Sequence, residues 1–286
     1  MNGYFDAQGS VYEVYALRYA THCDRRSGEN YLGDDPHDDI AMPLDFYCWV
    51  LRGAGRIVLV DTGCDAATAQ RRERRYLHSP ISLLRELGID PADVQDLIVT
   101  HMHYDHAGNL SAFSNATIHI QEAEMQYCTG RCMCHAAMRK PFETLDVCAA
   151  IERLHAGRVQ FANGDRQIAP GIDVHLIGGH TAGLQVVRVQ TARGQVVLAS
   201  DAAHYWDHVR SKRPFPIVQD VPRMLDGHRA IEALADGPDH IIPGHDPAVR
   251  LRFPRWRGHP DITALHLPPV AATSAVGYAA TPALAL

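Results

Sequence analysis

Residues 101–109 read His-Met-His-Tyr-Asp-His-Ala-Gly-Asn and follow a short, mainly β-branched run, Leu-Ile-Val-Thr, at residues 97–100. Such a run predicts a buried strand whose carboxyl end opens into this polar segment. Polar groups crowded at the end of a buried strand have no packing role, because each of them needs a partner. We therefore interpret the segment as a metal-binding loop whose candidate ligands are His101, His103, Asp105 and His106.

Three later loops share one arrangement, in which a predicted strand runs into a ligand-type residue flanked by small residues. They are GGHTAG at 178–183 with His180, LASD at 198–201 with Asp201, and IPGHD at 242–246 with His245. Small residues let the backbone bend tightly beside one imidazole or carboxylate. Each loop alone would be interpreted as a turn with a satisfied polar residue. Together with the first segment, the three loops complete a set of seven candidate ligands.

The composition is that of a folded protein with an excess of histidine. The chain has 286 residues, of which 46% are hydrophobic, 21% are charged and 18 are His, which is room for one or two domains. A formal net charge of −6 argues against a nucleic-acid partner. No apolar run approaches the roughly 20 residues that span a bilayer, and the first ten residues lack the features of a secretory signal. We expect a cytoplasmic protein with no membrane association.

The predicted strands fall into two batches, with predicted helices between and around them. The first batch is 56–61, 97–100 and 117–120, and the second is 158–161, 172–177, 184–190, 195–199 and 240–242. Helices are expected within 65–88 and at 121–127, 136–155 and 220–236. This order predicts an α/β protein built as a four-layer αββα sandwich, with two sheets packed face to face and helices outside.

The composition changes near residue 256, after which the chain is rich in Ala, Pro and Thr and has no clear period. We expect a single domain over residues 1–255 and a mobile tail over residues 256–286. The alternative is that the tail packs on a partner subunit, which leaves a homodimer open.

The seven cysteines are interpreted as reduced thiols, because the chain is large enough to fold without disulfides. Cys128, Cys132, Cys134 and His135 lie close together in the sequence. Their spacing, C-x3-C-x-C-H, matches none of the usual zinc patterns, so we expect ordinary thiols there.

The order of the candidate ligands resembles the metallo-β-lactamase fold superfamily, whose pattern is His-x-His-x-Asp-His, then a distant His, a bridging Asp and a final His. Within that superfamily, the stretches APGIDVHLIGGHTAGLQ and DHIIPGHDPAV are similar to the quorum-quenching N-acyl homoserine lactone lactonases. The resemblance spans about residues 40–255. Hydrolases of other lactones, such as those like 4-pyridoxolactonase, share this framework and remain an alternative.

The resemblance implies two divalent metal ions. One would be held by His101, His103 and His180, the other by Asp105, His106 and His245, and Asp201 would bridge them. Zinc suits these ligands, with iron, cobalt or manganese as alternatives. Asp61 resembles a carboxylate that steadies a ligand imidazole in this fold, although a turn-capping Asp would look the same.

The implied reaction opens the lactone ring of N-acyl homoserine lactones by attack of a metal-bridging hydroxide, because metal ions lower the pKa of bound water. Asp105 would protonate the leaving group, and a role as ligand alone is the alternative. Well-known lactonases place a Tyr three positions after the bridging Asp, where this chain has His204, with Tyr205 next. We expect His204 to donate to the oxyanion, with Tyr205 as the alternative.

The small-molecule lactone would also need an apolar pocket beside the metal ions. Its candidate residues, by position, are Met138, Phe142, Trp206 and Phe215. A glyoxalase II-like thioesterase on the same framework would need a basic site for the carboxylates of glutathione. No such cluster lies near the later motifs.

Overall fold

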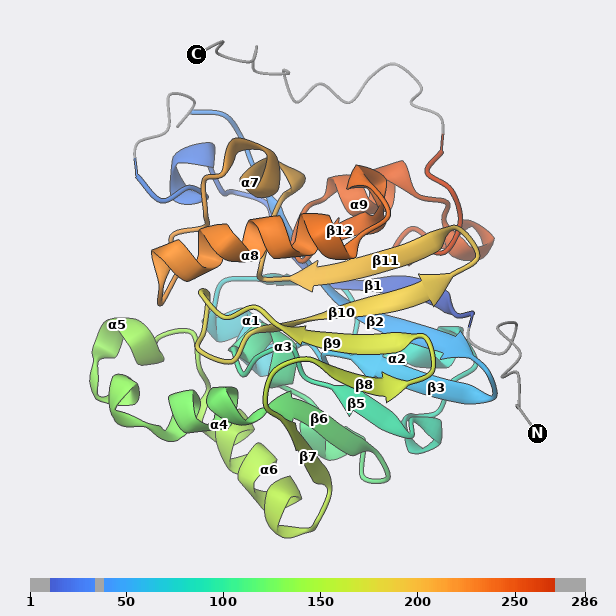
Figure 1. Cartoon of the computed structure of the whole chain (residues 1–286), viewed down its shortest axis with the longest axis horizontal. Coiled ribbons are helices and arrows are strands. Elements are labelled where there is room, and N and C mark those ends of the chain that lie inside the picture. The colour runs from blue at the N-terminus through green and yellow to red at the C-terminus, as the bar shows by residue number, and fades with distance from the viewer. Residues whose placement is uncertain (1–10, 34–38, 271–286) are drawn as a thin grey trace, which may run out of the picture.

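Two β-sheets form the centre of the protein in a computed structural model that describes residues 11–33 and 39–270 (Figure 1). The larger sheet runs in the order β13 (Ile262–Ala264), β1 (Glu13–His22), β2 (Leu44–Gly53), β3 (Arg56–Val60), β5 (Asp96–Ile98), β6 (Thr117–Gln121) and β7 (Val159–Ala162), with β4 (Arg75–Tyr76) also paired to β1. The smaller sheet runs β12 (Ile241–Pro243), β11 (Gly194–Ser200), β10 (Gln185–Thr191), β9 (Ile172–Leu176) and β8 (Arg166–Ala169).

The pairing directions bring the ends of distant strands together. Strands β3, β5, β6 and β7 are parallel to one another in the larger sheet, and β11 is parallel to β12 in the smaller one. Parallel strands end at the same edge of a sheet, so the loops that follow β3 and β5 lie side by side, as do those that follow β11 and β12.

Nine α-helices occur in the described part of the chain, and several of them cover the outer faces of the two sheets. They are α1 (Ala66–Arg71), α2 (Pro80–Glu86), α3 (Tyr104–Ala107), α4 (Glu122–Thr129), α5 (Ala136–Arg139), α6 (Thr144–His155), α7 (Trp206–Ser211), α8 (Val221–Leu234) and α9 (Ala248–Arg252). Short 3-10 turns occur at Ser27–Glu29, Pro91–Asp93, Leu110–Ala112, Arg131–Cys134, Pro238–His240 and Trp256–Gly258. Within the described ranges, none of the helices is long and apolar enough to cross a bilayer.

Three clusters of buried apolar side chains fill the spaces between four layers, which are helices, the larger sheet, the smaller sheet and helices. The first packs α2, α4 and α6 against the larger sheet and includes Leu84 of α2, Met125 of α4 and Leu97 of β5. The second lies between the sheets and includes Trp49. The third packs α8 against the smaller sheet through Ile231. Burial on both faces explains the continuous apolar runs of the strands, and the predicted αββα sandwich is confirmed.

Some elements differ from the expectation. Strands β1 and β2 were not predicted, although both are interior strands of the larger sheet, between β13 and β3. The segment 65–88 contains two short helices because the chain turns at Glu73, whose φ is +57°, before the short strand β4. The expected helix over 136–155 is divided into α5 and α6 near Pro141, which has no N–H to donate within a helix.

The structured domain continues beyond residue 255, so the predicted boundary is wrong. Strand β13 pairs with β1, with Ile262 opposite Leu17 and Ala264 opposite Tyr15. Ile262 and Leu265 are completely buried, which gives this segment a place in the core despite its irregular pattern. The rest of the expected tail, residues 271–286, lies outside the described residues.

A carboxyl group in α6 makes stability depend on pH. Burial, followed by the nearby Glu143 and Asp65, raises the pKa of Asp146 to about 7. A folded-state pKa above the ordinary value means that stability is lost as pH rises from about 4 through about 7. We expect Asp146→Asn to raise the free energy of unfolding more at pH 8 than at pH 5, by about 1 kcal/mol after allowance for partial exposure. Urea unfolding at both pH values checks this.

The exposed Asp93→Asn variant is the control for that experiment, and it should show no such difference between the two pH values. Equal gains for Asp146→Asn at pH 5 and pH 8 would show that the carboxyl group is not held in its protonated form.

Candidate metal centre

The loops that follow β5, β9, β11 and β12 converge between the two sheets. They carry the seven predicted ligands, and all seven side chains are buried. Two of these loops turn sharply at a residue of positive φ. The φ is +45° at Ser200, directly before Asp201, and +86° at Gly179, directly before His180. A Cβ on Gly179 would lie 2.6 Å from the Cα of Met224, so glycine is needed where this loop passes the start of α8.

One group of ligand atoms belongs to His101, His103 and His180. His180 Nε2 lies 2.9 Å from His103 Nδ1 and 3.2 Å from Asp201 Oδ2. His101 Nε2 lies 3.8 Å from the same carboxylate oxygen. The ligand atoms of these three imidazoles and of Asp201 all lie within 4.8 Å of one another.

A second group faces the other oxygen of Asp201. His245 Nε2 lies 3.0 Å and His106 Nε2 lies 3.1 Å from Asp201 Oδ1. Asp105 Oδ2 is 3.8 Å from each of these two imidazole nitrogens. Asp201 thus lies between the two groups and presents one oxygen to each.

These distances fit two metal ions. Bonds of 2.0–2.1 Å at a tetrahedral angle separate neighbouring ligand atoms by about 3.3 Å, and the separations above lie on both sides of that value. The Nε2 atoms of His101 and His106 are buried and have no hydrogen-bond partner among the described residues. Buried polar atoms of this kind need a partner, and an ion at the centre of each group would supply it.

The comparison with known proteins agrees with this geometry. A family model described as the metallo-beta-lactamase superfamily matches residues 43–245, which include all seven ligands. The chain belongs to the metallo-beta-lactamase superfamily.

Two relatives within this superfamily carry the name of a lactonase. The N-acyl homoserine lactonase of Bacillus cereus is 27% identical over 220 residues, which are 72% of this chain and 82% of that protein. N-acyl homoserine lactonase AttM of Azorhizobium caulinodans is 27% identical over 193 residues, 63% of this chain and 69% of that protein.

Solved structures share the fold. A quorum-quenching N-acyl homoserine lactone lactonase superposes with a TM-score of 0.68 at 23% identity, covering 83% of this chain and 93% of its own. AidC, a dizinc quorum-quenching lactonase, has a TM-score of 0.64 at 17% identity, covering 91% and 98%. These likenesses confirm the predicted metallo-beta-lactamase-like architecture.

The far nitrogens of several ligand imidazoles are held by the surrounding protein, as expected for metal ligands. His106 Nδ1 lies 2.7 Å from Asp61 Oδ2, and His245 Nδ1 lies 2.9 Å from the main-chain oxygen of Asp45. A donor N–H at Nδ1 leaves Nε2 with its lone pair toward the centre. Asp61 itself is fixed by the N–H and hydroxyl of Thr100. The predicted contact of Asp61 with a ligand imidazole is therefore present.

Burial and neighbouring charges shift the pKa values of the ligand imidazoles. Burial, followed by adjacent imidazoles, lowers the pKa of His101 and His103 well below the ordinary value, which leaves them neutral as ligands must be. At His106 burial acts in the same direction, but Asp201, Asp105 and Asp61 outweigh it and raise the pKa well above the ordinary value. A metal ion bound there must therefore displace a proton.

Replacement of Asp61 by Asn tests the support of His106. We expect metal affinity to fall about 10- to 100-fold, because in either orientation the amide NH₂ would face an N–H, that of His106 or that of Thr100, and so weaken the support of the ligand tautomer. Asn also tolerates the left-handed backbone of residue 61, whose φ is +59°. Competition with a chelator measures the affinity.

Asp96→Asn is a matched control for Asp61→Asn. Asp96 is also a buried carboxylate 2.7 Å from an imidazole, that of His119, but neither residue belongs to a candidate metal group. Equal metal affinity in Asp61→Asn and wild type would contradict the assigned role.

His204 reaches the centre, whereas Tyr205 does not. His204 Nε2 lies 3.1 Å from Asp201 Oδ2, and its ring stacks on Phe215 with centroids 3.7 Å apart. The Tyr205 hydroxyl is directed to the main-chain oxygens of Met42 and Pro43, at 3.0 Å each. The alternative placement of Tyr205 at the oxyanion is therefore not supported.

The tautomer of His204 follows from its surroundings. Its Nδ1 is buried and has no hydrogen-bond partner among the described residues, whereas Nε2 faces the carboxylate of Asp201. A proton on Nε2 satisfies a hydrogen bond that a proton on Nδ1 would not. Burial holds the pKa of His204 well below its ordinary value although Asp201 acts in the opposite direction, so the ring is neutral. His204 thus presents a neutral Nε2–H group to the centre.

Two of the four predicted pocket residues lie against side chains of the centre. Phe142 meets the ring of His103 edge-on with centroids 4.6 Å apart, and Phe215 stacks on His204. The placement of Trp206 in the pocket is wrong, because its indole N–H donates to the main-chain oxygen of Ile241 and its ring packs against the core between the sheets.

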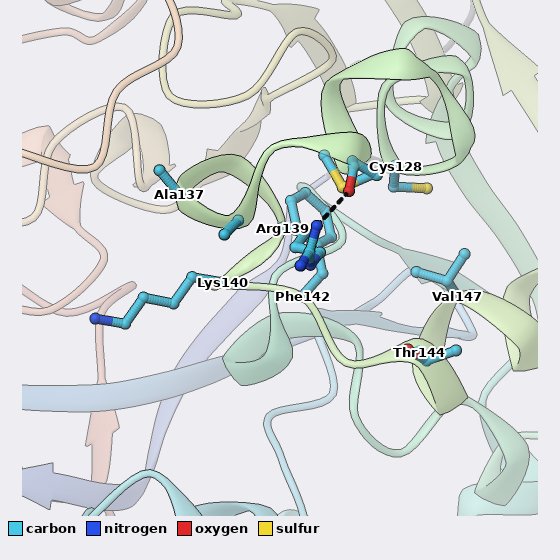
Figure 2. Close-up of a pocket in the computed structure, with 9 residues that line it drawn as sticks. Cys128, Ala137, Arg139, Lys140, Phe142, Thr144 and Val147 are labelled. Atoms are coloured by element: carbon cyan, nitrogen blue, oxygen red, sulfur yellow. Dashed lines mark hydrogen bonds between the residues drawn. The ribbon is translucent and has the colours of Figure 1, made fainter.

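Phe142 also lines a hollow of about 690 Å³ between α5 and α6 (Figure 2). The other lining residues are the uncharged Cys128, Met133, Ala136, Ala137, Thr144 and Val147, together with Arg139 and Lys140. The Arg139 guanidinium donates to the main-chain oxygens of Met133 and Cys134, and Lys140 extends away from the hollow in Figure 2. Met138 lies half-buried in α5 but is not one of the lining residues.

The cysteine cluster is separate from this centre. Cys128 is buried, Cys132 half-buried and Cys134 exposed, and none of them belongs to a metal-binding group among the described residues.

Two residues of the centre were missed in the sequence analysis. Thr100 holds Asp61, and Asp45 holds His245 through its main-chain oxygen. Thr100 could have been found because it directly precedes His101. A contact made by a main-chain oxygen has no signal in the sequence.

Proposed function

We propose that this protein is a dinuclear zinc hydrolase that opens the lactone ring of N-acyl homoserine lactones. The observation that carries the proposal is the pair of ligand groups that share Asp201. The names of the relatives supply the substrate class, because both are N-acyl homoserine lactonases that align over most of their length. Mixed nitrogen and oxygen ligands at tetrahedral spacing favour zinc.

When bound, two such ions supply a nucleophile at neutral pH and neutralise developing negative charge. The chain itself must then position the lactone, stabilise the oxyanion and protonate the leaving oxygen. The ligand residues His101, His103, His106, His180, His245, Asp105 and Asp201 hold the ions in this proposal.

His204 would stabilise the oxyanion. Attack on the carbonyl carbon moves negative charge to the carbonyl oxygen, and a fixed donor already at that place lowers the barrier. The neutral Nε2–H of His204 is directed to the centre, and the stack on Phe215 holds the ring in this orientation.

Asp105 would deliver the proton to the leaving alkoxide. Its carboxylate is part of the second ligand group, and its own main-chain oxygen accepts a hydrogen bond of 2.8 Å from the Tyr19 hydroxyl. A carboxyl group beside the reacting atoms can take a proton in the first step and give it to the leaving oxygen in the second.

The acyl chain would lie along Phe142 toward the hollow between α5 and α6. Phe142 joins the two places, since it contacts His103 on one side and lines the hollow on the other. Each buried methylene stabilises a ligand by about 0.8 kcal/mol, so the hollow favours lactones that carry an acyl chain over simple γ-lactones.

A panel of substrates tests the proposal. Protein of measured zinc content should release acid in a pH-stat from N-acyl homoserine lactones, with higher kcat/KM for longer acyl chains and little activity on a simple γ-lactone. Pyridoxolactone and a glutathione thioester are the comparison substrates. Acid release from either of these alone would overturn the proposed substrate.

The cytoplasm is the cellular location that we propose, because the thiols of this chain favour a reducing compartment. All seven cysteines are free, and Cys23, Cys134 and Cys148 are exposed. Exposed thiols persist in a reducing compartment.

A further inference from the structure

The side chain of Glu124, in the first turn of α4, connects two loops of the metal centre. Its Oε1 accepts a hydrogen bond of 2.9 Å from the N–H of Met102. Its Oε2 accepts bonds of 2.6 Å from the Thr181 hydroxyl and 3.0 Å from the N–H of Gly183. Met102 lies between the ligands His101 and His103, and Thr181 directly follows the ligand His180.

Glu124 is completely buried, and the donors that hold it are neutral. A carboxylate in such a place is costly unless several donors satisfy it. Burial raises the pKa of Glu124, and the three hydrogen bonds act against that rise. A smaller apolar side chain at this position would leave the N–H groups of Met102 and Gly183 without an acceptor. We therefore expect a buried carboxylate here despite the cost of its desolvation.

The loop of His180 is built for this contact. A Cβ on Gly183 would lie 2.2 Å from the main-chain nitrogen of Glu124 and 2.5 Å from its Cα. Glycine is therefore needed for the loop to approach the start of α4. The close approach and the three hydrogen bonds are independent observations, and both join α4 to the loop that carries His180.

We propose that Glu124 is a positioning residue that sets the spacing of His101, His103 and His180, and so controls the affinity of this one metal group. The inference rests on the dinuclear centre of the proposed function, but not on the substrate. Asp61 has the corresponding position behind the other group, because it holds His106. Glu124 would therefore set the metal affinity of the first group, and Asp61 would set that of the second.

Glu124→Gln tests the proposal with little change in shape. Whichever oxygen is replaced, an NH₂ group would face an N–H or hydroxyl donor, so at least one loop would shift. Single-ion backgrounds separate the two groups: His245→Ala weakens the second group, and His180→Ala weakens the first. Zn²⁺ titration of the metal-free protein against a chelator should show a 10- to 100-fold loss for Glu124→Gln in the His245→Ala background. The same substitution should change affinity less than threefold in the His180→Ala background.

Unfolding of the metal-free proteins gives the readout that separates positioning from stability. A purely structural role would lower Tm and leave zinc affinity unchanged in both backgrounds, and this result would overturn the proposal. Equal losses in both backgrounds would also overturn it. Asp96→Asn is the control, because it removes a buried carboxylate that pairs with His119 and belongs to no candidate metal group.

Thr181→Val provides a second route if Glu124→Gln folds poorly. It removes only the shortest of the three bonds, and we expect a loss of several-fold in the His245→Ala background alone. The readout is zinc affinity, so protein that binds two ions but leaves every lactone intact would refute the proposed substrate and leave the role of Glu124 standing.

Discussion

Replacement of Asp201 by Asn should lower kcat/KM by about three orders of magnitude, or about 4 kcal/mol in transition-state stabilisation. Both oxygens of this carboxylate are in use, one facing His180 at 3.2 Å and the other facing His245 at 3.0 Å. Asn keeps one oxygen and places an NH₂ group, whose lone pair is delocalised into the carbonyl group, toward the other metal group. Zinc content should therefore fall from two ions per chain to one or fewer, as measured by elemental analysis.

Asp207→Asn is the control for this experiment, because Asp207 lies in α7 and bonds to Tyr31 and Arg210 rather than to a ligand. It should retain two ions and its activity. Asp201→Asn protein that keeps two ions and at least a tenth of its activity would show that Asp201 does not bridge the groups.

Replacement of His204 by Phe should lower kcat by about 10²- to 10³-fold, the usual cost of removing one oxyanion donor. Phe preserves the stack on Phe215 but has no N–H to offer. The effect should appear in kcat more than in KM, because the donor acts on charge that develops in the transition state. Zinc content should be unchanged. Steady-state kinetics on an N-acyl homoserine lactone gives both values.

Tyr205→Phe is the matched comparison, since it removes a hydroxyl from the neighbouring residue. That hydroxyl bonds to Met42 and Pro43 and accepts from Asn30, so its loss should lower stability by about 1 kcal/mol and leave kcat within a factor of about three. A large loss of kcat in Tyr205→Phe together with a small one in His204→Phe would reverse the assignment.

The sequence predicted the centre better than the surrounding fold. The ligands follow strand ends, where small residues and polar side chains stand out against apolar runs, so their positions could be found without knowledge of the pairing. The strands β1 and β2 have no such contrast. They are buried along most of their length, and a continuous apolar run does not separate a strand from a buried helix.

Contacts between distant segments account for the remaining differences. Glu124 has no motif, and its role depends on α4 reaching the loop of Gly183, which the local pattern does not encode. Trp206 lies beside His204 and Tyr205 in the sequence, but its indole is drawn to Ile241 because a buried N–H needs an acceptor. Adjacent residues at the start of α7 thus face different layers.

The pairing of β13 with β1 bears on the order in which the protein folds. The first described strand obtains one of its pairing partners only from the last, so the larger sheet is completed by a contact between opposite ends of the described chain. Contacts of this sequence separation form slowly. During synthesis, all seven metal ligands leave the ribosome before β13 does. The nascent chain can therefore bind metal while one edge of its larger sheet is still open, which is a state prone to aggregation.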